Sequence, residues 1–337
     1  MVRSDVVLNA DGADFGSGLL VKLHAAVEQL NAEEILEVRG GAPSVPEDLA
    51  AWCVLTGNAL VGPLQVRKGA VEVEPDPPKL GTRLWLYSNF NCNLACDYCC
   101  AESSPAASAR QLPVELVRAA VAEFVSGGGA EVIITGGEPF LHPELGELID
   151  AAIEHVPVTV LTNGMVFHRG NRRRTLEALD RERVTLQISL DSATPELHDR
   201  HRGAGSYDRA RAGIALARSL GFRVRIAATI DAADAEEVAA LRELLDTEGV
   251  PPEDQIIRRI AREGFADDGV VLTRDDLYPE PTVAVDGIWW HPVGITDPAL
   301  RVTDAPLPIR AAIAEMDRIL QVTAEQQDNT RKAFRCA

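Results

Sequence analysis

Positive charge is scarce in this chain. Of its 337 residues, 33 are Lys or Arg and 51 are Asp or Glu, so the formal net charge at pH 7 is −18. A surface of that sign repels polyanions, and we therefore expect neither nucleic acid nor an anionic membrane as a partner. No apolar run approaches the ~20 residues that a membrane-spanning helix needs. Residues Met1–Ser17 also lack a basic-then-apolar leader, so we expect a cytoplasmic protein.

Aromatic residues are also few, at 5% of the chain, but 46% of it is hydrophobic and 25% is charged. Those proportions are ordinary for a folded protein and exclude disordered and collagen-like classes. Four of the six cysteines lie within nine positions. In a cytoplasmic chain such clustering indicates metal ligation or redox chemistry rather than a disulfide framework. The six are Cys53, Cys92, Cys96, Cys99, Cys100 and Cys336.

Prolines crowd the segment 74–81, which predicts a linker after a first domain of residues 1–73. The apolar spacing before the linker predicts a small two-layer domain of the order β-α-β-α-β-β, with both helices on one face of the sheet. The expected strands are Val6–Leu8, Ile35–Arg39, Ala59–Val66 and Gly69–Glu74, and the expected helices are Gly18–Leu30 and Ser44–Leu55.

After the linker, residues 82–262 alternate strand and helix patterns. The strands are continuous Val/Ile/Leu-rich runs, which is typical of a parallel sheet covered on both faces. Six such strands predict an α/β open partial barrel whose site lies at the carboxyl ends of the strands. From Gly264 the repeat stops, and residues 263–337 predict a hairpin at 283–291, a helix at 308–322 and a loose tail. The strands are expected at 84–88, 131–135, 158–162, 184–190, 223–230 and 255–260, with helices at 113–126, 143–155, 173–179, 207–220 and 235–247.

The loop after the first of these strands contains Cys92, Cys96 and Cys99 in the spacing C-x3-C-x2-C. Three thiolates on one tight loop can hold three irons of a cubane iron–sulfur cluster and leave the fourth iron open for a ligand. The alternative is a structural zinc knot that adds Cys100. Adjacent cysteines rarely aim both sulfurs at one tetrahedral ion, so we favour the cluster.

This cysteine loop, together with Thr135-Gly136-Gly137-Glu138-Pro139, resembles the radical S-adenosylmethionine (radical SAM) enzymes. The resemblance implies a partial (β/α)6 barrel, one [4Fe–4S] cluster and SAM as cofactors. It also implies a 5′-deoxyadenosyl radical that abstracts hydrogen from a substrate, and an electron donor such as flavodoxin or ferredoxin. The reaction subtype and the substrate, a peptide or a small molecule, stay open.

The resemblance also implies roles for individual residues. Cys92, Cys96 and Cys99 would bind iron, and Tyr98 would lie along the adenine. The methionine amino group would be approached by Gly136, Gly137, Glu138 and Pro139, the ribose by Ser189 and Asp191, and the SAM carboxylate by Arg202. Asn163 would line the same rim, and Thr229 would flank the adenine.

The flanking segments resemble two further families. The hairpin at 283–291 is similar to SPASM or twitch extensions but has no cysteine, so we predict no auxiliary cluster. We expect His291 to pack, Cys100 to be a spectator thiol and Cys336 to be a free thiol in the tail. The first domain resembles the TusA-like sulfur-carrier fold through Leu8-Asn9-Ala10-Asp11-Gly12.

At the place of the persulfide cysteine of that family, this chain has Phe15-Gly16-Ser17-Gly18. We therefore expect a docking or scaffolding role for the first domain, with Cys53 a packed thiol. The alternative function is an iron–sulfur sulfur-relay adaptor without radical chemistry, whose cluster would not respond to SAM.

Overall fold

The computed structural model describes residues 4–30, 34–56, 58–68, 79–231 and 235–324. The chain divides into two compact units, Met1–Pro75 and Asp76–Ala337. Most of the predicted linker and the whole C-terminal tail with Cys336 lie outside the described residues. In the part described, no helix is both long enough and apolar enough to span a membrane.

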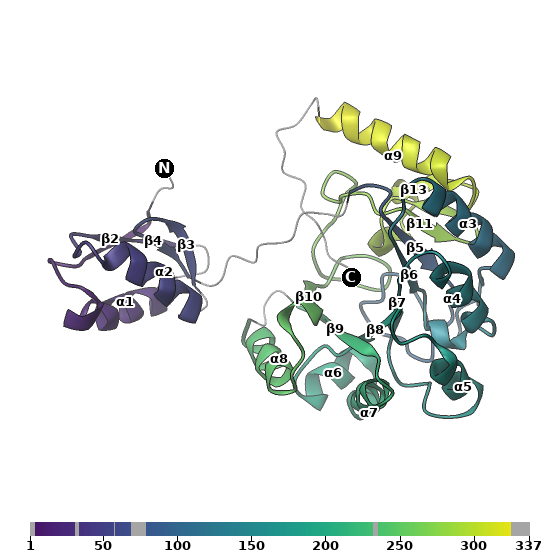
Figure 1. Ribbon diagram of the computed structural model, residues 1–337, viewed down its shortest axis with the longest axis horizontal. Coiled ribbons are helices and arrows are strands. Elements are labelled where there is room, and N and C mark those ends of the chain that lie inside the picture. Colours follow the sequence, from purple (N-terminus) through teal and green to yellow (C-terminus); the bar gives the residue numbers. More distant parts are fainter. Residues whose placement is uncertain (1–3, 31–33, 57, 69–78, 232–234, 325–337) are drawn as a thin grey trace. The chain divides into compact units, whose positions relative to one another are not determined.

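The N-terminal unit is a four-stranded sheet with two helices on one side of it (Figure 1). Its core lies between these layers, where Leu23, Leu36 and Leu49 are fully buried. The strand order is β1-β2-β4-β3, with β1 and β2 parallel and β2, β4 and β3 antiparallel. The elements are β1 (Val6–Asn9), α1 (Leu19–Glu28), β2 (Ile35–Arg39), α2 (Val45–Thr56), β3 (Ala59–Gly62) and β4 (Gln65–Arg67).

The prediction of one strand over Ala59–Val66 was wrong. This segment is a hairpin, in which Leu60 pairs with Val66 across a turn at Pro63 and Leu64. Proline fixes its own φ angle and has no amide hydrogen to give to a ladder, so a strand ends there readily. The other predicted closing strand, Gly69–Glu74, lies outside the described residues.

The second unit is built on a nine-stranded sheet of the order β10-β9-β8-β7-β6-β5-β11-β12-β13. Six neighbouring strands run parallel in sequence order, and helices on the outer side of the sheet connect them (Figure 1). The strands are β5 (Arg83–Tyr87), β6 (Glu131–Thr135), β7 (Val158–Thr162), β8 (Val184–Ser189), β9 (Arg223–Ile230) and β10 (Gln255–Arg259). The helices are α3 (Val114–Ser126), α4 (Leu145–Ile153), α5 (Gly170–Ala178), α6 (Pro195–Arg202), α7 (Ser206–Ser219) and α8 (Ala235–Thr247).

Alternate residues of these strands face opposite sides of the sheet. Residues such as Ile134 and Ile188 join the large core beneath the helices. Trp85, Ile133 and Leu161 form a separate apolar cluster. Two residues further along β5 and β6, Tyr87 and Thr135 line a cavity. Because the strands are parallel, their carboxyl ends all open at this edge.

Helix α6 was not predicted, since residues 191–206 had been expected to form a loop. Its eight residues include one leucine, so it shows no apolar periodicity. The visible signal is Thr194 at the N-cap position followed by Pro195 in the first turn, which is a common helix start. This helix matters because it ends at Arg202.

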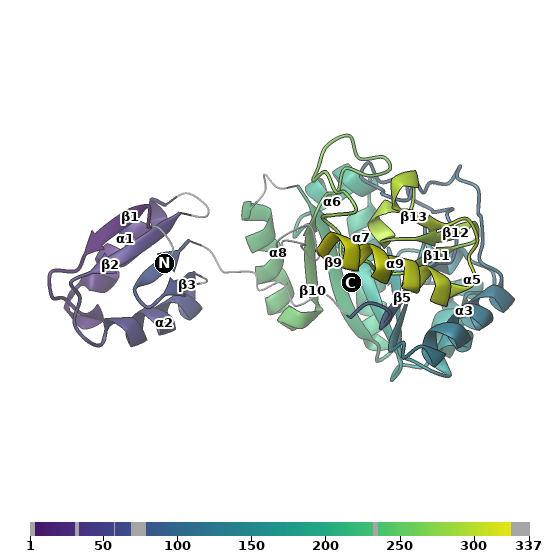
Figure 2. The same ribbon diagram turned by 90° about the horizontal axis from the view of Figure 1, so that it is seen from above.

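The C-terminal segment extends the same sheet. The predicted hairpin is present as β11 (Thr282–Ala284) and β12 (Gly287–Trp289), and β11 pairs in parallel with β5. Strand β13 (Arg301–Thr303), which was not predicted, pairs with β12. Helix α9 (Ile309–Ala324) packs beside α3 and β13 (Figures 1 and 2), with Met316 fully buried.

Candidate active site

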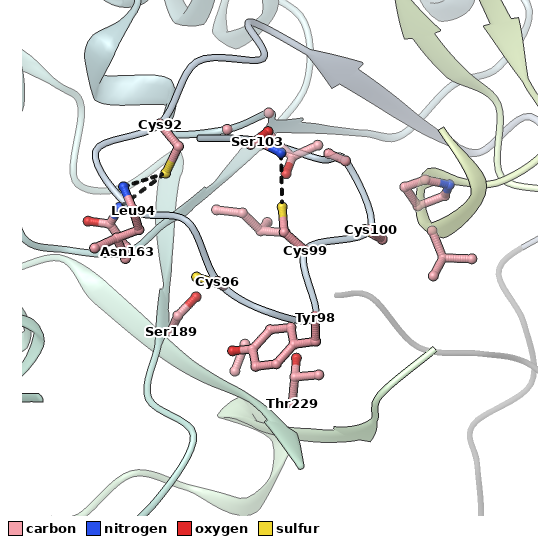
Figure 3. Close-up of a pocket in the computed structure, with 18 of the residues that line it drawn as sticks. Cys92, Leu94, Cys96, Tyr98, Cys99, Cys100, Ser103, Asn163, Ser189 and Thr229 are labelled. Carbon is pink, nitrogen blue, oxygen red and sulfur yellow. Dashed lines mark hydrogen bonds between the residues drawn. The ribbon is translucent and has the colours of Figure 1, made fainter. Parts of the chain in front are cut away.

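One cavity opens at the carboxyl ends of the six parallel strands (Figure 3). Each of these strands, or the loop directly after it, contributes to the wall, and Pro292 and Val293 reach it from the C-terminal segment. The cavity brings together most of the residues predicted from the sequence, although they span more than a hundred positions. These are Cys92, Cys96, Tyr98, Cys99, Gly136, Gly137, Asn163, Ser189, Arg202 and Thr229. Three predicted residues, Glu138, Pro139 and Asp191, do not line it.

The three motif cysteines surround the cavity on the loop after β5 (Figure 3). Cys92 and Cys96 are buried and Cys99 is half-buried. The Cys92 Sγ accepts hydrogen bonds from the Leu94 amide at 3.4 Å and from Asn163 Nδ2 at 3.9 Å. One donor from the cysteine loop and one from Asn163 therefore reach the Cys92 sulfur, and such hydrogen bonds favour a thiolate ligand.

Burial dominates the acidity of these thiols. Desolvation raises the pKa of Cys92 to about 12, with a further contribution from the Glu138 carboxylate. Desolvation likewise raises the pKa of Cys96 to about 11. Both side chains therefore hold their protons at neutral pH in the protein alone. A metal that binds there displaces those protons, so iron affinity at this site rises with pH.

The chemistry of the donors matches a cluster. Among the described residues, no three His, Cys, Asp or Glu side chains converge closely enough to hold one metal ion. Three thiols around a shared cavity suit a [4Fe–4S] cluster, in which each thiolate binds its own iron. Cys100 also lines the cavity.

The glycine pair after β6 packs against the backbone of the cysteine loop. A Cβ on Gly136 would lie 2.4 Å from the Asn89 carbonyl oxygen, and one on Gly137 would lie 2.3 Å from that of Asn91. The Gly137 amide donates to the Asn89 carbonyl at 2.8 Å, and the Glu138 amide donates to the Asn91 carbonyl at 3.1 Å. Only glycine allows this approach, so the pair fixes the cysteine loop against β6.

The Glu138 side chain links the ends of two strands by hydrogen bonds and does not line the cavity. Its side chain is completely buried, and its carboxylate accepts from the Phe140 amide at 3.0 Å, the Thr162 hydroxyl at 2.8 Å and the Asn163 amide at 2.8 Å. Burial raises its pKa in spite of these three hydrogen bonds. The approach of Glu138 and Pro139 to the methionine amino group stays a prediction. In this structure the Glu138 carboxylate accepts hydrogen bonds at the ends of β6 and β7, and Pro139 is buried in the turn.

Asp191 is the centre of a second buried network. Its carboxylate accepts from Arg202 at 2.6 and 3.1 Å, from the Thr229 amide at 3.0 Å and from the Tyr98 hydroxyl. Burial alone would raise the pKa of Asp191, but the facing guanidinium outweighs that effect and lowers it. Ribose binding by Asp191 stays a prediction. In this structure the Asp191 side chain is 1% exposed, and its oxygens accept hydrogen bonds within the chain.

The remaining wall residues give the cavity its polarity. Arg202, Arg258 and Arg259 line it, and among the described residues no Asp or Glu does, although the chain as a whole is acidic. Arg202 is paired with Asp191, and Arg258 and Arg259 come from β10. Sequence reasoning missed Arg258 and Arg259, and the only available signal was the polar end of an otherwise apolar strand.

Asn89 and Asn91 were also missed, although both asparagines lie within three residues before Cys92 in the sequence. Asn89 Nδ2 donates to the Asn91 carbonyl at 2.8 Å and to the Glu138 carbonyl at 3.1 Å. His291 behaves as expected for a packed residue: it is 1% exposed, and its Nδ1 accepts from the Val293 amide at 3.2 Å.

Comparison with known proteins identifies this region. Residues 87–247 match the radical SAM superfamily. The chain is 35% identical over 143 residues to the antilisterial bacteriocin subtilosin biosynthesis protein AlbA of Bacillus subtilis. The aligned region covers 41% of this chain and 31% of that protein. It is 35% identical over 148 residues to the mycofactocin maturase MftC of Mycobacterium tuberculosis, which covers 42% of this chain and 36% of the relative. The chain thus spans about a third of the length of these relatives.

A solved structure agrees on the fold. Native anSMEcpe with bound AdoMet superimposes with a TM-score of 0.55 over 71% of this chain and 82% of that chain, at 12% sequence identity. Residues 87–247 therefore form a radical SAM domain with an α/β fold around a parallel sheet. This confirms the class predicted from the cysteine and glycine motifs, and that superfamily uses a [4Fe–4S] cluster and SAM.

Proposed function

We propose that this chain is a radical SAM enzyme that uses one [4Fe–4S] cluster to cleave SAM reductively and abstract hydrogen from a substrate. The observation that supports it most directly is the placement of Cys92, Cys96 and Cys99 around the cavity at the carboxyl ends of the parallel strands. When bound, the cluster and SAM would supply an electron and a 5′-deoxyadenosyl radical.

The protein's own contribution would be to position and enclose these cofactors. Cys92, Cys96 and Cys99 would hold three irons. The backbone of Gly136 and Gly137 would accompany the methionine end of SAM, and Ser189, Asn163 and Thr229 would offer polar groups to its nucleoside end. These residues all line the same cavity.

Arg202 would meet the SAM carboxylate, with Asp191 acting on it as a positioning residue. The guanidinium lines the cavity while two of its nitrogens are held by Asp191. A buried arginine fixed in this way is pre-oriented for an anionic partner. Tyr98, which donates its hydroxyl to Asp191, would present its ring to the adenine.

The substrate would be a peptide. AlbA is by its name a bacteriocin biosynthesis protein, and a structure of anSMEcpe contains bound AdoMet together with the Kp18Cys peptide. Pro292 and Val293 give the cavity an apolar surface, and Arg258 and Arg259 also line it. This combination favours a peptide segment with an acidic or carboxylate group.

Two further parts of the proposal concern partners. A cytoplasmic flavodoxin or ferredoxin would deliver the electron. The N-terminal unit would be a TusA-like domain that lacks the sulfur-bearing cysteine and serves in docking. Its two helices on one face of a four-stranded sheet are compatible with that fold.

The decisive test is anaerobic. The full chain is reconstituted with iron and sulfide, reduced with dithionite, mixed with SAM and analysed for 5′-deoxyadenosine by chromatography. We expect four irons per chain, a change in the electron paramagnetic resonance (EPR) spectrum on adding SAM, and 5′-deoxyadenosine. The variant with Cys92, Cys96 and Cys99 all changed to alanine should lose iron and product, while Cys100→Ala should keep the iron.

Two results would contradict the proposal. One is retention of the full iron content by the triple variant. The other is a fully loaded cluster whose spectrum ignores SAM and which yields no 5′-deoxyadenosine, as the iron–sulfur adaptor hypothesis predicts.

A further inference from the structure

Ser103 has a buried hydroxyl that no other group in the described part of the chain engages. Its side chain is 2% exposed, its Oγ has no hydrogen-bond partner, and it lines the same cavity as the three motif cysteines. It follows Cys99 by four residues on the same loop (Figure 3). Neither the motif nor the roles proposed above use it.

A buried hydroxyl without a hydrogen-bond partner destabilises the fold, because it has lost its hydrogen bonds to water. The buried carboxylates of Glu138 and Asp191 beside this cavity have their hydrogen-bond partners within the chain. The Ser103 hydroxyl lies on the cavity wall and has none, so it calls for a partner inside the cavity. The backbone amide of the same residue already donates to Cys99 Sγ at 3.4 Å, so Ser103 is placed against this sulfur.

We propose that the Ser103 hydroxyl donates a hydrogen bond to Cys99 Sγ when this sulfur is bound to the cluster. This inference rests on the proposed function, because it requires the cluster. Ser103 would then be a positioning residue that acts on the cofactor and leaves iron ligation to the cysteines.

The distribution of donors supports this assignment. Cys92 Sγ receives two hydrogen bonds, from Leu94 and Asn163, whereas Cys99 Sγ receives only the Ser103 amide among the contacts of the described residues. A hydrogen bond from the Ser103 hydroxyl would give Cys99 Sγ two hydrogen bonds, the same number that Cys92 Sγ receives. Hydrogen bonds to cluster sulfurs stabilise the reduced, more negative form and thereby raise the reduction potential.

The test is a redox titration followed by EPR on the reconstituted full chain without SAM. We expect Ser103→Ala to shift the midpoint potential to a more negative value, and Ser103→Thr to restore it at least in part. The matched control is Ser104→Ala, because Ser104 is the next residue of the loop and its side chain does not line the cavity. That control should titrate like the unmodified protein.

A second measurement reads the hydrogen bond directly. In deuterium oxide, electron–nuclear double resonance of the reduced cluster should show an exchangeable deuteron that disappears in Ser103→Ala. EPR detects only loaded clusters, so both measurements remain valid if the variant assembles less iron.

Equal midpoint potentials and equal deuteron signals in Ser103→Ala and Ser104→Ala would overturn the proposal. A shift that occurs only when SAM is present would also overturn it, because the hydroxyl would then serve SAM and not the cluster. If the unmodified chain assembled no cluster, the proposed function would fail first, so the two failures are distinguishable.

Discussion

The two units of this chain each bury cysteine thiols, and the surroundings of these thiols differ. In the N-terminal unit, Cys53 is 2% exposed within the packed core around Leu19 and Leu49, and burial raises its pKa to about 11. In the second unit, Cys92 and Cys96 are also buried, at 8% and 9% exposed, and their pKa values are raised in the same direction. Burial and pKa therefore do not tell a packed thiol from a ligand.

What separates the two regions is the space and the polar support beside the thiol. Cys92 lines a cavity and its sulfur accepts hydrogen bonds, whereas Cys53 belongs to an apolar cluster of the small unit. In the second unit, buried carboxylates such as Glu138 and Asp191 hold the loops around the cavity in place. The candidate site is therefore distinguished by the groups that hold a cavity open beside the thiols. The following variants test this contrast between Cys92, which lines a cavity, and Cys53, which is packed in a core.

The largest effect is expected from Asp191→Asn. This change leaves the buried Arg202 guanidinium without its counter-charge, which typically costs about 3–5 kcal/mol of folding free energy. It should also lower the affinity for SAM, since Arg202 would lose its fixed orientation. The measurements are urea unfolding of the apoprotein and SAM binding by isothermal titration of the reconstituted protein.

Its control is Asp304→Asn, because Asp304 is 95% exposed in its ion pair with Arg301. An exposed pair contributes at most about 1 kcal/mol, so this variant should behave like the unmodified protein. Equal unfolding midpoints for the two variants would show that Asp191 does not stabilise the fold around the cavity.

A smaller effect is expected from Gly137→Ala. The new methyl group would lie 2.3 Å from the Asn91 carbonyl oxygen, so the cysteine loop must move away from β6. Overpacking of this kind costs about 1–3 kcal/mol, and the displaced loop should assemble fewer irons per chain. Unfolding midpoint and iron content after reconstitution measure both effects.

Gly146→Ala in α4 provides the comparison, because the nearest atom to its new Cβ would be 3.9 Å away. Alanine also favours a helix over glycine by about 1 kcal/mol, so this variant should be neutral or more stable. A Gly137→Ala protein with full iron content would show that the close approach of the two loops is dispensable.

The smallest effect is expected from Cys53→Ala. Removing one buried sulfur from the core should cost the N-terminal unit about 1 kcal/mol, within the usual range for a single core truncation. Hydrogen exchange of peptides from that unit, followed by mass spectrometry, would detect the loss. Iron content and 5′-deoxyadenosine formation should stay unchanged, and a drop in either would break the distinction between the two kinds of thiol.

The six parallel strands of the second unit were predictable because each is a continuous apolar run with both faces covered, whereas β13 was missed. Strands β6, β7 and β9 have the expected bounds. The hairpin β3–β4 and helix α6 were not predictable, because each is too short to show a periodic pattern of apolar residues. Both were marked only by a proline, at positions 63 and 195.

At the site, the cysteine spacing and the glycine pair could be recognised because their chemistry is local. The partners of Asp191 could not, because Tyr98 is 93 positions away and Thr229 is 38 positions away. The glycine pair was located correctly, but the contact that requires it is with the backbone of Asn89 and Asn91. Sequence patterns identify which residues are special and do not show which distant groups they meet.

The segment that contributes Pro292 and Val293 to the cavity wall also contacts the cysteine loop. It joins the sheet through β11 beside β5, and the Thr296 hydroxyl donates to the Cys100 carbonyl at 2.9 Å. The Phe265 amide donates to the Cys99 carbonyl at 3.1 Å. A change in this segment should therefore alter the cysteine loop together with the wall.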